Sequence, residues 1–123
     1  NKIKIKSTIN TLRDFIPMTD TCEAIFLLMR HKISHDESCI FNVGGNWQKT
    51  ILQIAYLIKE RYYVTQKKKV DVLYKENLIE QSDSFNFNLD KIIDKGFKIS
   101  DNKRISEEID SLISFCTQHS AAL

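Results

Sequence analysis

The sequence predicts a small mixed α/β fold, and three observations lead to this prediction. Short runs with apolar residues at every second position, the pattern of strands, alternate along the chain with runs of helical spacing. The length of 123 residues gives room for one ordinary domain. Hydrophobic residues make up 42 % of the chain and charged residues 28 %, which is typical of a globular protein and excludes a disordered or fibrous one.

The N-terminal part predicts two strands followed by a helix. Lys2 to Lys6 alternates strictly between lysine and isoleucine, so it predicts a half-exposed strand whose lysines protect a sheet edge. A second strand is expected over Leu12 to Ile16 and ends at Pro17, the only proline. Thr19 and Asp20 are both candidate helix caps, and Asp20, with a glutamate three residues later, has the spacing of a capping box, so a helix is predicted over residues 20–29.

This helix carries apolar residues on both of its sides. Its main apolar stripe contains Ala24, Ile25, Leu28 and Met29. Phe26 and Leu27 lie off that stripe. A helix that is apolar on two sides needs packing partners on two sides. We therefore expect part of it to form a surface for a partner.

The middle of the chain predicts a strand, a helix and another strand. The apolar run from Cys39 to Val43, closed by Gly44 and Gly45, predicts a buried strand that enters a tight turn. Thr50, with a glutamine three residues later, predicts the start of a long amphipathic helix. Val70 to Tyr74 alternates and is expected to be another strand.

Two helices complete the expected order. Asn88 is expected to cap a short helix that runs to Lys95 and stops at Gly96. Apolar residues at helical spacing from Ile105 to Cys116 predict the last helix. The final residues 121–123 follow no pattern and are interpreted as the start of a vector-derived tag.

Composition excludes several classes of function. The longest uninterrupted apolar run has six residues, so no segment is long enough to span a bilayer, and there is no secretory signal pattern. A net charge of +2 is too close to neutral for nucleic acid to be the main partner. Three cysteines without close spacing argue against a disulfide framework and favour a reducing, cytoplasmic location.

The sequence contains no self-sufficient active site. Its only glycines are Gly44, Gly45 and Gly96, so neither a dinucleotide-binding loop nor a P-loop is present. Tyr63 and Lys67 have the Tyr-x-x-x-Lys spacing of a short-chain dehydrogenase, but they lie at a ragged helix end beside further lysines, and we interpret the match as chance.

Possible metal ligands occur at four-residue intervals, at His31, His35 and Cys39. The polar residues just before Cys39 indicate a loop, and a loop would keep the three side chains off a common face. We therefore expect no metal site.

Several segments resemble, in the right order, the NAD-dependent nucleotide-sugar epimerases and dehydratases, which are extended short-chain dehydrogenase/reductases. Arg13 to Asp20, R-D-F-I-P-M-T-D, is similar to the R-D-[FY]-[IV]-x-[VM]-x-D segment of that family. Further along the chain, Ile40 to Gly45 is similar to the N-V-G-[SG] strand and turn of the family, and Thr50 to Ala55 is similar to the capped helix that follows that turn. Asn88 to Phe97 is similar to the D-x-x-K…L-G-[WF] element, and Ile105 to Ile109 is similar to the closing helix. The resemblance extends over nearly the whole chain.

The resemblance implies that residues 1–120 are the C-terminal, substrate-binding portion of such an enzyme, with most of the Rossmann core missing. The cofactor, NAD or NADP, and the catalytic tyrosine and lysine would then belong to an upstream Rossmann portion, and this fragment would be inactive alone. The partners implied are a nucleotide-sugar substrate, the upstream portion and further copies in a homo-oligomer.

Two residues receive a substrate-binding role from the resemblance. Arg13 matches the arginine that contacts the diphosphate of the nucleotide sugar, a task suited to a planar, permanently charged guanidinium. The alternative is an Arg13 that pairs with Asp14 or with a helix end. Phe15 matches a position that borders the nucleotide, and its alternative is a place in the core.

The sequence departs from the family at two points. No arginine occupies the stretch from Tyr74 to Asp83, where the family often has a second phosphate-binding arginine, and Lys75 would supply only a point charge there. The proline that usually follows the L-G-W motif is also missing after Phe97.

A second hypothesis belongs to a different class of protein. Because the chain has no catalytic constellation, it is also compatible with a standalone binding or oligomerisation module without catalysis. The apolar residues on both sides of the helix that contains Phe26 and Leu27 fit a partner surface under either hypothesis.

Overall fold

The computed structural model describes residues 2–31, 39–75 and 87–119. The chain divides into two compact units. Unit 1 comprises residues 1–13, 49–83 and 101–123, and unit 2 comprises residues 14–48 and 84–100. The interpretation of residues 121–123 as a tag falls outside the described residues.

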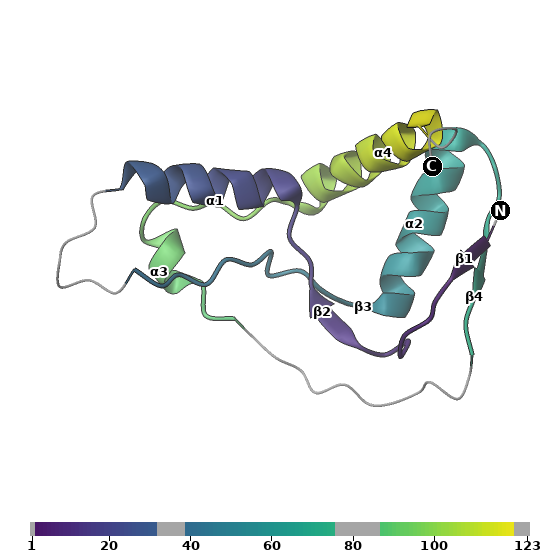
Figure 1. Cartoon of the computed structure of the whole chain (residues 1–123), viewed down its shortest axis with the longest axis horizontal. Helices are drawn as coiled ribbons and strands as arrows, with labels where there is room; N and C mark the ends of the chain where they lie inside the picture. The colour runs from purple at the N-terminus through teal and green to yellow at the C-terminus, as the bar shows by residue number, and fades with distance from the viewer. Residues whose placement is uncertain (1, 32–38, 76–86, 120–123) are drawn as a thin grey trace. The chain divides into compact units, whose positions relative to one another are not determined.

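The elements follow the expected order of strand, strand, helix, strand, helix, strand, helix and helix (Figure 1). Within the described residues, a mixed α/β fold with short strands and four helices is thereby confirmed, although the third strand lies at other residues than predicted. The elements are β1 (Lys2–Lys4), β2 (Leu12–Asp14), α1 (Met18–Arg30), β3 (Gln48–Thr50), α2 (Ile51–Gln66), β4 (Asp71–Leu73), α3 (Asp90–Ile93) and α4 (Asn102–His119).

Unit 1 contains a parallel strand pair. β1 and β4 lie side by side, with Lys2 opposite Asp71 and Lys4 opposite Leu73 (Figure 1). Beyond β1, the amide of Ile5 donates to the carbonyl of Leu73 at 2.9 Å and extends the pairing by one bond. The lysines of β1 are exposed and the isoleucine between them is half-buried, so the predicted alternation is confirmed over a shorter strand.

The long helix of unit 1 begins as the sequence predicts. The hydroxyl of Thr50 accepts a hydrogen bond from the amide of Gln53 at 3.1 Å, and the side chain of Gln53 accepts one from the amide of Thr50 at 2.8 Å. This reciprocal capping box satisfies two of the amides that a helix start leaves unpaired.

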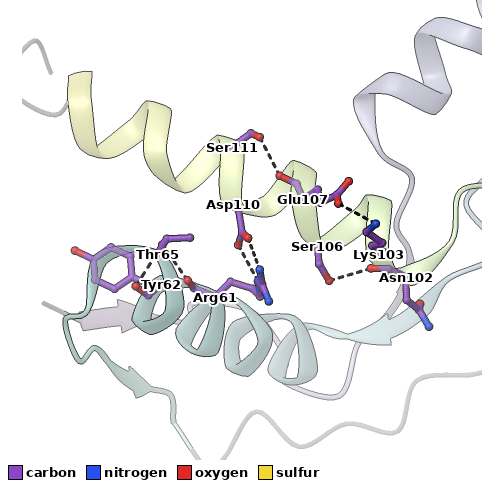
Figure 2. Close-up of polar contacts among 9 residues, drawn as sticks. All are labelled: Arg61, Tyr62, Thr65, Asn102, Lys103, Ser106, Glu107, Asp110 and Ser111. Carbon is purple, nitrogen blue, oxygen red and sulfur yellow. Dashed lines mark hydrogen bonds and ion pairs between the residues drawn. The ribbon is translucent and has the colours of Figure 1, made fainter.

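α2 and α4 are joined by an ion pair between Arg61 and Asp110, drawn in Figure 2. The guanidinium donates two parallel hydrogen bonds to the carboxylate, one of them from Nε to Oδ1 at 2.7 Å. Both side chains are about three-quarters buried, at 27 % and 25 % exposure. These hydrogen bonds, with a smaller contribution from the positive charge of Arg61, hold the pKa of Asp110 below its ordinary value of 3.8.

Unit 2 is built on a small apolar cluster. Its buried members come from α1, from α3 and from the residues that flank α3, and they are Ala24, Leu89, Ile92 and Phe97. Figure 1 shows α3 next to α1 in this unit. Gly96, expected as the stop of the short helix, takes a positive φ of 102°, which favours glycine and turns the chain back over this cluster.

The start of α1 differs from the prediction. The helix begins at Met18, directly after Pro17, and no side chain caps it. Asp20 is fully buried at 0 % exposure, and its carboxylate accepts hydrogen bonds from Ser100, from the amide at 2.9 Å and from the hydroxyl at 2.5 Å. Asp20 is therefore not a helix cap, because a distant segment of the same unit takes both of its oxygens.

The predicted strand from Cys39 to Val43 is wrong. The segment forms no strand, and Ile40 is 80 % exposed rather than buried. A strand needs a hydrogen-bonding partner, and no described strand pairs with this segment. The third strand is instead β3, which pairs with β2.

The short helix is shorter than predicted and is not capped by Asn88. It extends only from Asp90 to Ile93, and its N-terminal flanking residue is Leu89. The side chain of Asn88 accepts a hydrogen bond from the amide of Asp90 at 2.9 Å, which forms a turn just before the helix.

The buried carboxylate of Asp20 yields a stability prediction. Asp20→Ala should lower the free energy of unfolding by about 1.5–3 kcal/mol, the range for hydrogen bonds to a charged group. A double-mutant cycle with Ser100→Ala, measured by urea unfolding, should show coupling between the two residues. Glu23→Ala is the comparison, because a capping box would make both acidic residues matter equally, whereas Glu23 is exposed and Asp20 is fully buried, so Glu23→Ala should have the smaller effect. Equal effects without coupling to Ser100 would contradict the structure.

The lowered pKa of Asp110 yields a pH prediction. A carboxyl group with a depressed pKa in the folded state adds stability that is present above its unfolded pKa and is lost as the pH falls through the folded value. Asp110→Asn should therefore destabilise the chain at neutral pH, and its difference from the wild type should shrink below about pH 4. Urea unfolding across this range measures it. Glu107→Gln is the matched control on α4, because Glu107 forms only an exposed pair with Lys103 at 3.8 Å and should change little. A pH-independent effect of Asp110→Asn would contradict this account.

Candidate substrate-binding segments

The first candidate segment is the chain around the R-D-F motif, where the carboxylate of Asp14 organises a loop of unit 2. Its oxygens accept hydrogen bonds from the amide of Gly45 at 2.8 Å and from the amide of Trp47 at 2.7 Å. A carboxylate bound by two backbone amides is a strong and directional contact. The second residue of the motif therefore fixes the loop from Gly44 to Trp47 against the end of β2.

The two glycines of this loop are required by close packing. A Cβ atom on Gly45 would lie 2.0 Å from the carbonyl oxygen of Phe15, and one on Gly44 would lie 2.6 Å from Oδ2 of Asp14. The left-handed residue of the loop is Asn46, with a φ of 48°. The expectation that the glycines serve a tight turn is thus corrected: Gly45 is needed where two backbones meet, Gly44 lies against the carboxylate of Asp14, and the residue with the turn conformation is Asn46.

Phe15 belongs to the same arrangement. Its amide donates to the carbonyl of Trp47 at 3.2 Å, and its ring meets the ring of Trp47 edge to face, with the centroids 6.2 Å apart. Both side chains are half-buried, so each retains an accessible part. Sequence reasoning missed Trp47, which is the only tryptophan and is the last residue of the loop.

Arg13 lies in the middle of β2, and its side chain is exposed. The guanidinium donates a hydrogen bond to the carbonyl of Leu12 at 3.1 Å. The alternative of an ion pair with Asp14 does not form among the described residues, where both oxygens of Asp14 are bound by the loop amides. The structure thus leaves most of the guanidinium donors directed to solvent.

A second candidate segment lies in unit 1, at the carboxyl ends of the parallel strands β1 and β4. A hollow of about 480 Å³ opens there, lined by Lys4, Ile5, Lys6, Leu73, Tyr74 and Lys75. Three of these six residues are lysines, all exposed, and Tyr74 is 40 % exposed. In α/β sheets the crevice beyond the carboxyl ends of the strands is the usual place for a ligand. Three ammonium groups around it suit an anion.

The remaining sequence candidates carry no site among the described residues. His35 lies outside them, and no group of three or more potential metal ligands is found within residues 2–31, 39–75 and 87–119. Lys67 has a left-handed φ of 54° and donates its amide to the carbonyl of Tyr63. The Tyr-x-x-x-Lys spacing therefore coincides with the end of α2.

In the described part of the chain, no helix is long and apolar enough to cross a membrane.

The solved structures similar to this chain include the following two proteins. One is UDP-N-acetylglucosamine 4-epimerase from Methanobrevibacter ruminantium M1 in complex with UDP-N-acetylmuramic acid, with a TM-score of 0.68 and 20 % identity over 95 % of this chain. The other is RMD from Pseudomonas aeruginosa complexed with NADPH, with a TM-score of 0.67 and 17 % identity over 93 % of this chain. No protein-family model and no curated protein matches the chain.

The similarity covers only part of each solved structure. This chain spans 35 % of the epimerase chain and 34 % of the RMD chain. At these identities the comparison shows a shared fold. The expected fold class is thus confirmed in its coarser form, as a small mixed α/β fold that matches about a third of an epimerase and of an NADPH-binding protein.

The packing of the loop yields a mutational prediction. Gly45→Ala should destabilise the chain by about 3 kcal/mol or more, because its Cβ would meet a backbone carbonyl that has no room to move aside. Urea unfolding of the 123-residue chain measures this. Asn46→Gly, in the same loop, is the control and should stay within about 1 kcal/mol of the wild type, since glycine accepts the positive φ without strain. If Asn46→Gly were the more damaging change, the loop would be held by its turn residue instead.

Proposed function

We propose that the chain is the C-terminal, substrate-binding portion of an NAD(P)-dependent nucleotide-sugar epimerase, dehydratase or reductase. The observation that carries the proposal is the fold similarity over 95 % of the chain to about a third of a UDP-N-acetylglucosamine 4-epimerase. The R-D-F segment from Arg13 to Phe15, recognised from the sequence, supports it independently.

In this proposal the chain binds the sugar nucleotide and does not hold the cofactor. Its three glycines, Gly44, Gly45 and Gly96, form no dinucleotide-binding loop, so the residues present do not fit a nicotinamide dinucleotide. NAD or NADP, bound by the portion outside this chain, would supply the hydride chemistry. The fragment alone is then inactive.

Arg13 is the residue proposed to contact the diphosphate. Its guanidinium is exposed, keeps its charge at any physiological pH and can donate two parallel hydrogen bonds to phosphate oxygens. Phe15 is proposed to border the nucleotide, since its half-buried ring is held in place by Trp47.

The lysines at the carboxyl ends of β1 and β4 support an anionic ligand. Lys75 lies in the stretch where the family often has a second phosphate-binding arginine, and it lines the same hollow as Lys4 and Lys6. Several point charges around an open hollow attract a diphosphate without fixing its orientation. We propose that the ammonium group of Lys75 attracts the diphosphate and that the planar guanidinium of Arg13 fixes its orientation.

One observation favours the alternative, a standalone binding or oligomerisation module. The outward side of α1 exposes apolar residues, among them Phe26 at 59 % and Met29 at 75 %. An immunoblot of the source cells separates the two functions. A native protein about three times larger than this chain supports the enzyme, as the 35 % coverage of the epimerase suggests. A native protein of the size of this chain supports the module.

The role of Arg13 is tested in the native enzyme by titration calorimetry with UDP-N-acetylglucosamine. Arg13→Ala should weaken binding by about 1.5–3 kcal/mol, the range for a charged hydrogen bond, and leave the affinity for NAD(P) unchanged. Arg13→Lys should recover only part of the loss, because lysine keeps the positive charge but cannot donate two parallel hydrogen bonds to the phosphate oxygens. Lys75→Ala should weaken binding less than Arg13→Ala.

Lys103→Ala is the control for loss of one positive charge, because Lys103 is 82 % exposed on α4. It should leave both affinities unchanged. An unchanged sugar-nucleotide affinity in Arg13→Ala would remove Arg13 from the site, and an equal loss of sugar-nucleotide and cofactor affinity would indicate unfolding.

A further inference from the structure

Trp47 and Phe15, both in unit 2, form an aromatic pair that keeps accessible surface. The two rings meet edge to face at an interplanar angle of 73°. A contact of this kind covers a face of at most one of the two rings, whereas a parallel stack would cover one face of each. Because both side chains are also only half-buried, part of their aromatic surface is open to a ligand.

The backbone holds this pair in a fixed place. The amide of Trp47 donates to Oδ1 of Asp14 at 2.7 Å, and the carbonyl of Trp47 accepts from the amide of Phe15 at 3.2 Å. The loop before Trp47 lies close against the neighbouring backbone, since a Cβ atom on Gly45 would lie 2.0 Å from the carbonyl oxygen of Phe15. Side chains on a backbone held in this way lose little freedom when a ligand binds, which favours affinity.

A tryptophan in such a loop suits a planar ligand. Loops that a scaffold holds in place carry binding residues more often than the core does. Indole has a large aromatic face, and tryptophan is enriched where a protein contacts a partner. Aromatic side chains bind nucleobases by stacking, which depends on the face of the base and not on its hydrogen-bonding edge.

Of the parts of a nucleotide sugar, only the base is planar and aromatic. The diphosphate is charged and suits guanidinium and ammonium groups. The sugar offers hydroxyl groups, which call for hydrogen-bonding partners. The chemistry of the aromatic pair therefore selects the base as the part that it contacts.

We infer that Trp47 is a binding residue, and that its indole ring stacks on the base of the nucleotide sugar beside the ring of Phe15. The inference rests on the proposed function, because it takes a nucleotide sugar as the ligand. It adds a residue that lies outside the R-D-F motif, 32 positions after Phe15 in the sequence. Asp14 is then a positioning residue, since its carboxylate holds the amide of Trp47.

Titration calorimetry of the native protein separates the base from the diphosphate. The probes are UDP, which contains both groups, and inorganic pyrophosphate, which has no base and is measured by competition with UDP. Trp47→Leu keeps an apolar side chain but removes the aromatic face, and it should weaken UDP binding at least about tenfold. The affinity for pyrophosphate should change by less than about twofold, because pyrophosphate makes no stacking contact.

Two further variants distinguish stacking from support of the fold. Trp47→Phe keeps an aromatic face and should retain more of the UDP affinity than Trp47→Leu does. Phe115→Leu is the matched control, because Phe115 is an aromatic residue on α4 in unit 1 and is 59 % exposed. It should leave the affinities for both probes unchanged.

The fluorescence of Trp47 provides a second readout, since it is the only tryptophan of this chain. The signal of Trp47 in the native protein is the difference in emission between the wild type and Trp47→Phe. A base stacked on indole quenches its emission, so this difference should decrease when UDP is added. It should stay constant when pyrophosphate is added.

The outcomes separate this inference from the proposed function. If the wild type binds UDP and Trp47→Leu binds it equally well, the role of Trp47 is overturned and the proposed function stands. Equal weakening of UDP and pyrophosphate in Trp47→Leu also overturns this role, because Trp47 would then only support the fold. A wild-type protein that binds neither UDP nor UDP-N-acetylglucosamine overturns the proposed function and this inference with it.

Discussion

The candidate site depends on one interaction, in which the carboxylate of Asp14 accepts hydrogen bonds from two backbone amides. Gly45 and Trp47 donate to it at 2.8 and 2.7 Å, and the glycines allow the loop to come close enough for these bonds to form. Because the loop is fixed, Trp47 supports the ring of Phe15 from one side. The middle residue of the R-D-F motif, Asp14, thus holds the loop in place through its side chain.

Features that depend on near neighbours in the sequence could be predicted, and features that depend on distant ones could not. The capping box of Thr50 and Gln53 requires two residues three apart, and it forms as expected. Asp20 has the same local pattern with its glutamate, yet Ser100 takes its carboxylate. The segment after Cys39 has the composition of a strand, but a strand depends on a partner that no local pattern supplies.

The candidate site, like the fold, could be predicted only where it depends on a local motif. Arg13 and Phe15 came from a resemblance in the motif, and their roles remain predictions. Trp47 and the lysine-lined hollow required the fold, because the hollow joins Lys6 to Lys75 across a strand pairing that brings distant segments together. The alternating lysines at the N-terminus were interpreted as protection of a sheet edge, and the structure adds that two of them border this hollow.

The pairing of β1 with β4 also sets an order of events during folding. β1 is the first element of the chain, and its partner follows β2, α1, β3 and α2. A contact between segments so far apart in the sequence forms slowly, because the chain loses the entropy of closing a long loop before the hydrogen bonds between the strands can form. Within this chain, the pairing of β1 with β4 can therefore form only once Asp71 to Leu73 has been made. Lys2, Lys4 and Lys6 act in that interval as gatekeepers, since their mutual repulsion disfavours pairing with the same strand of another nascent chain.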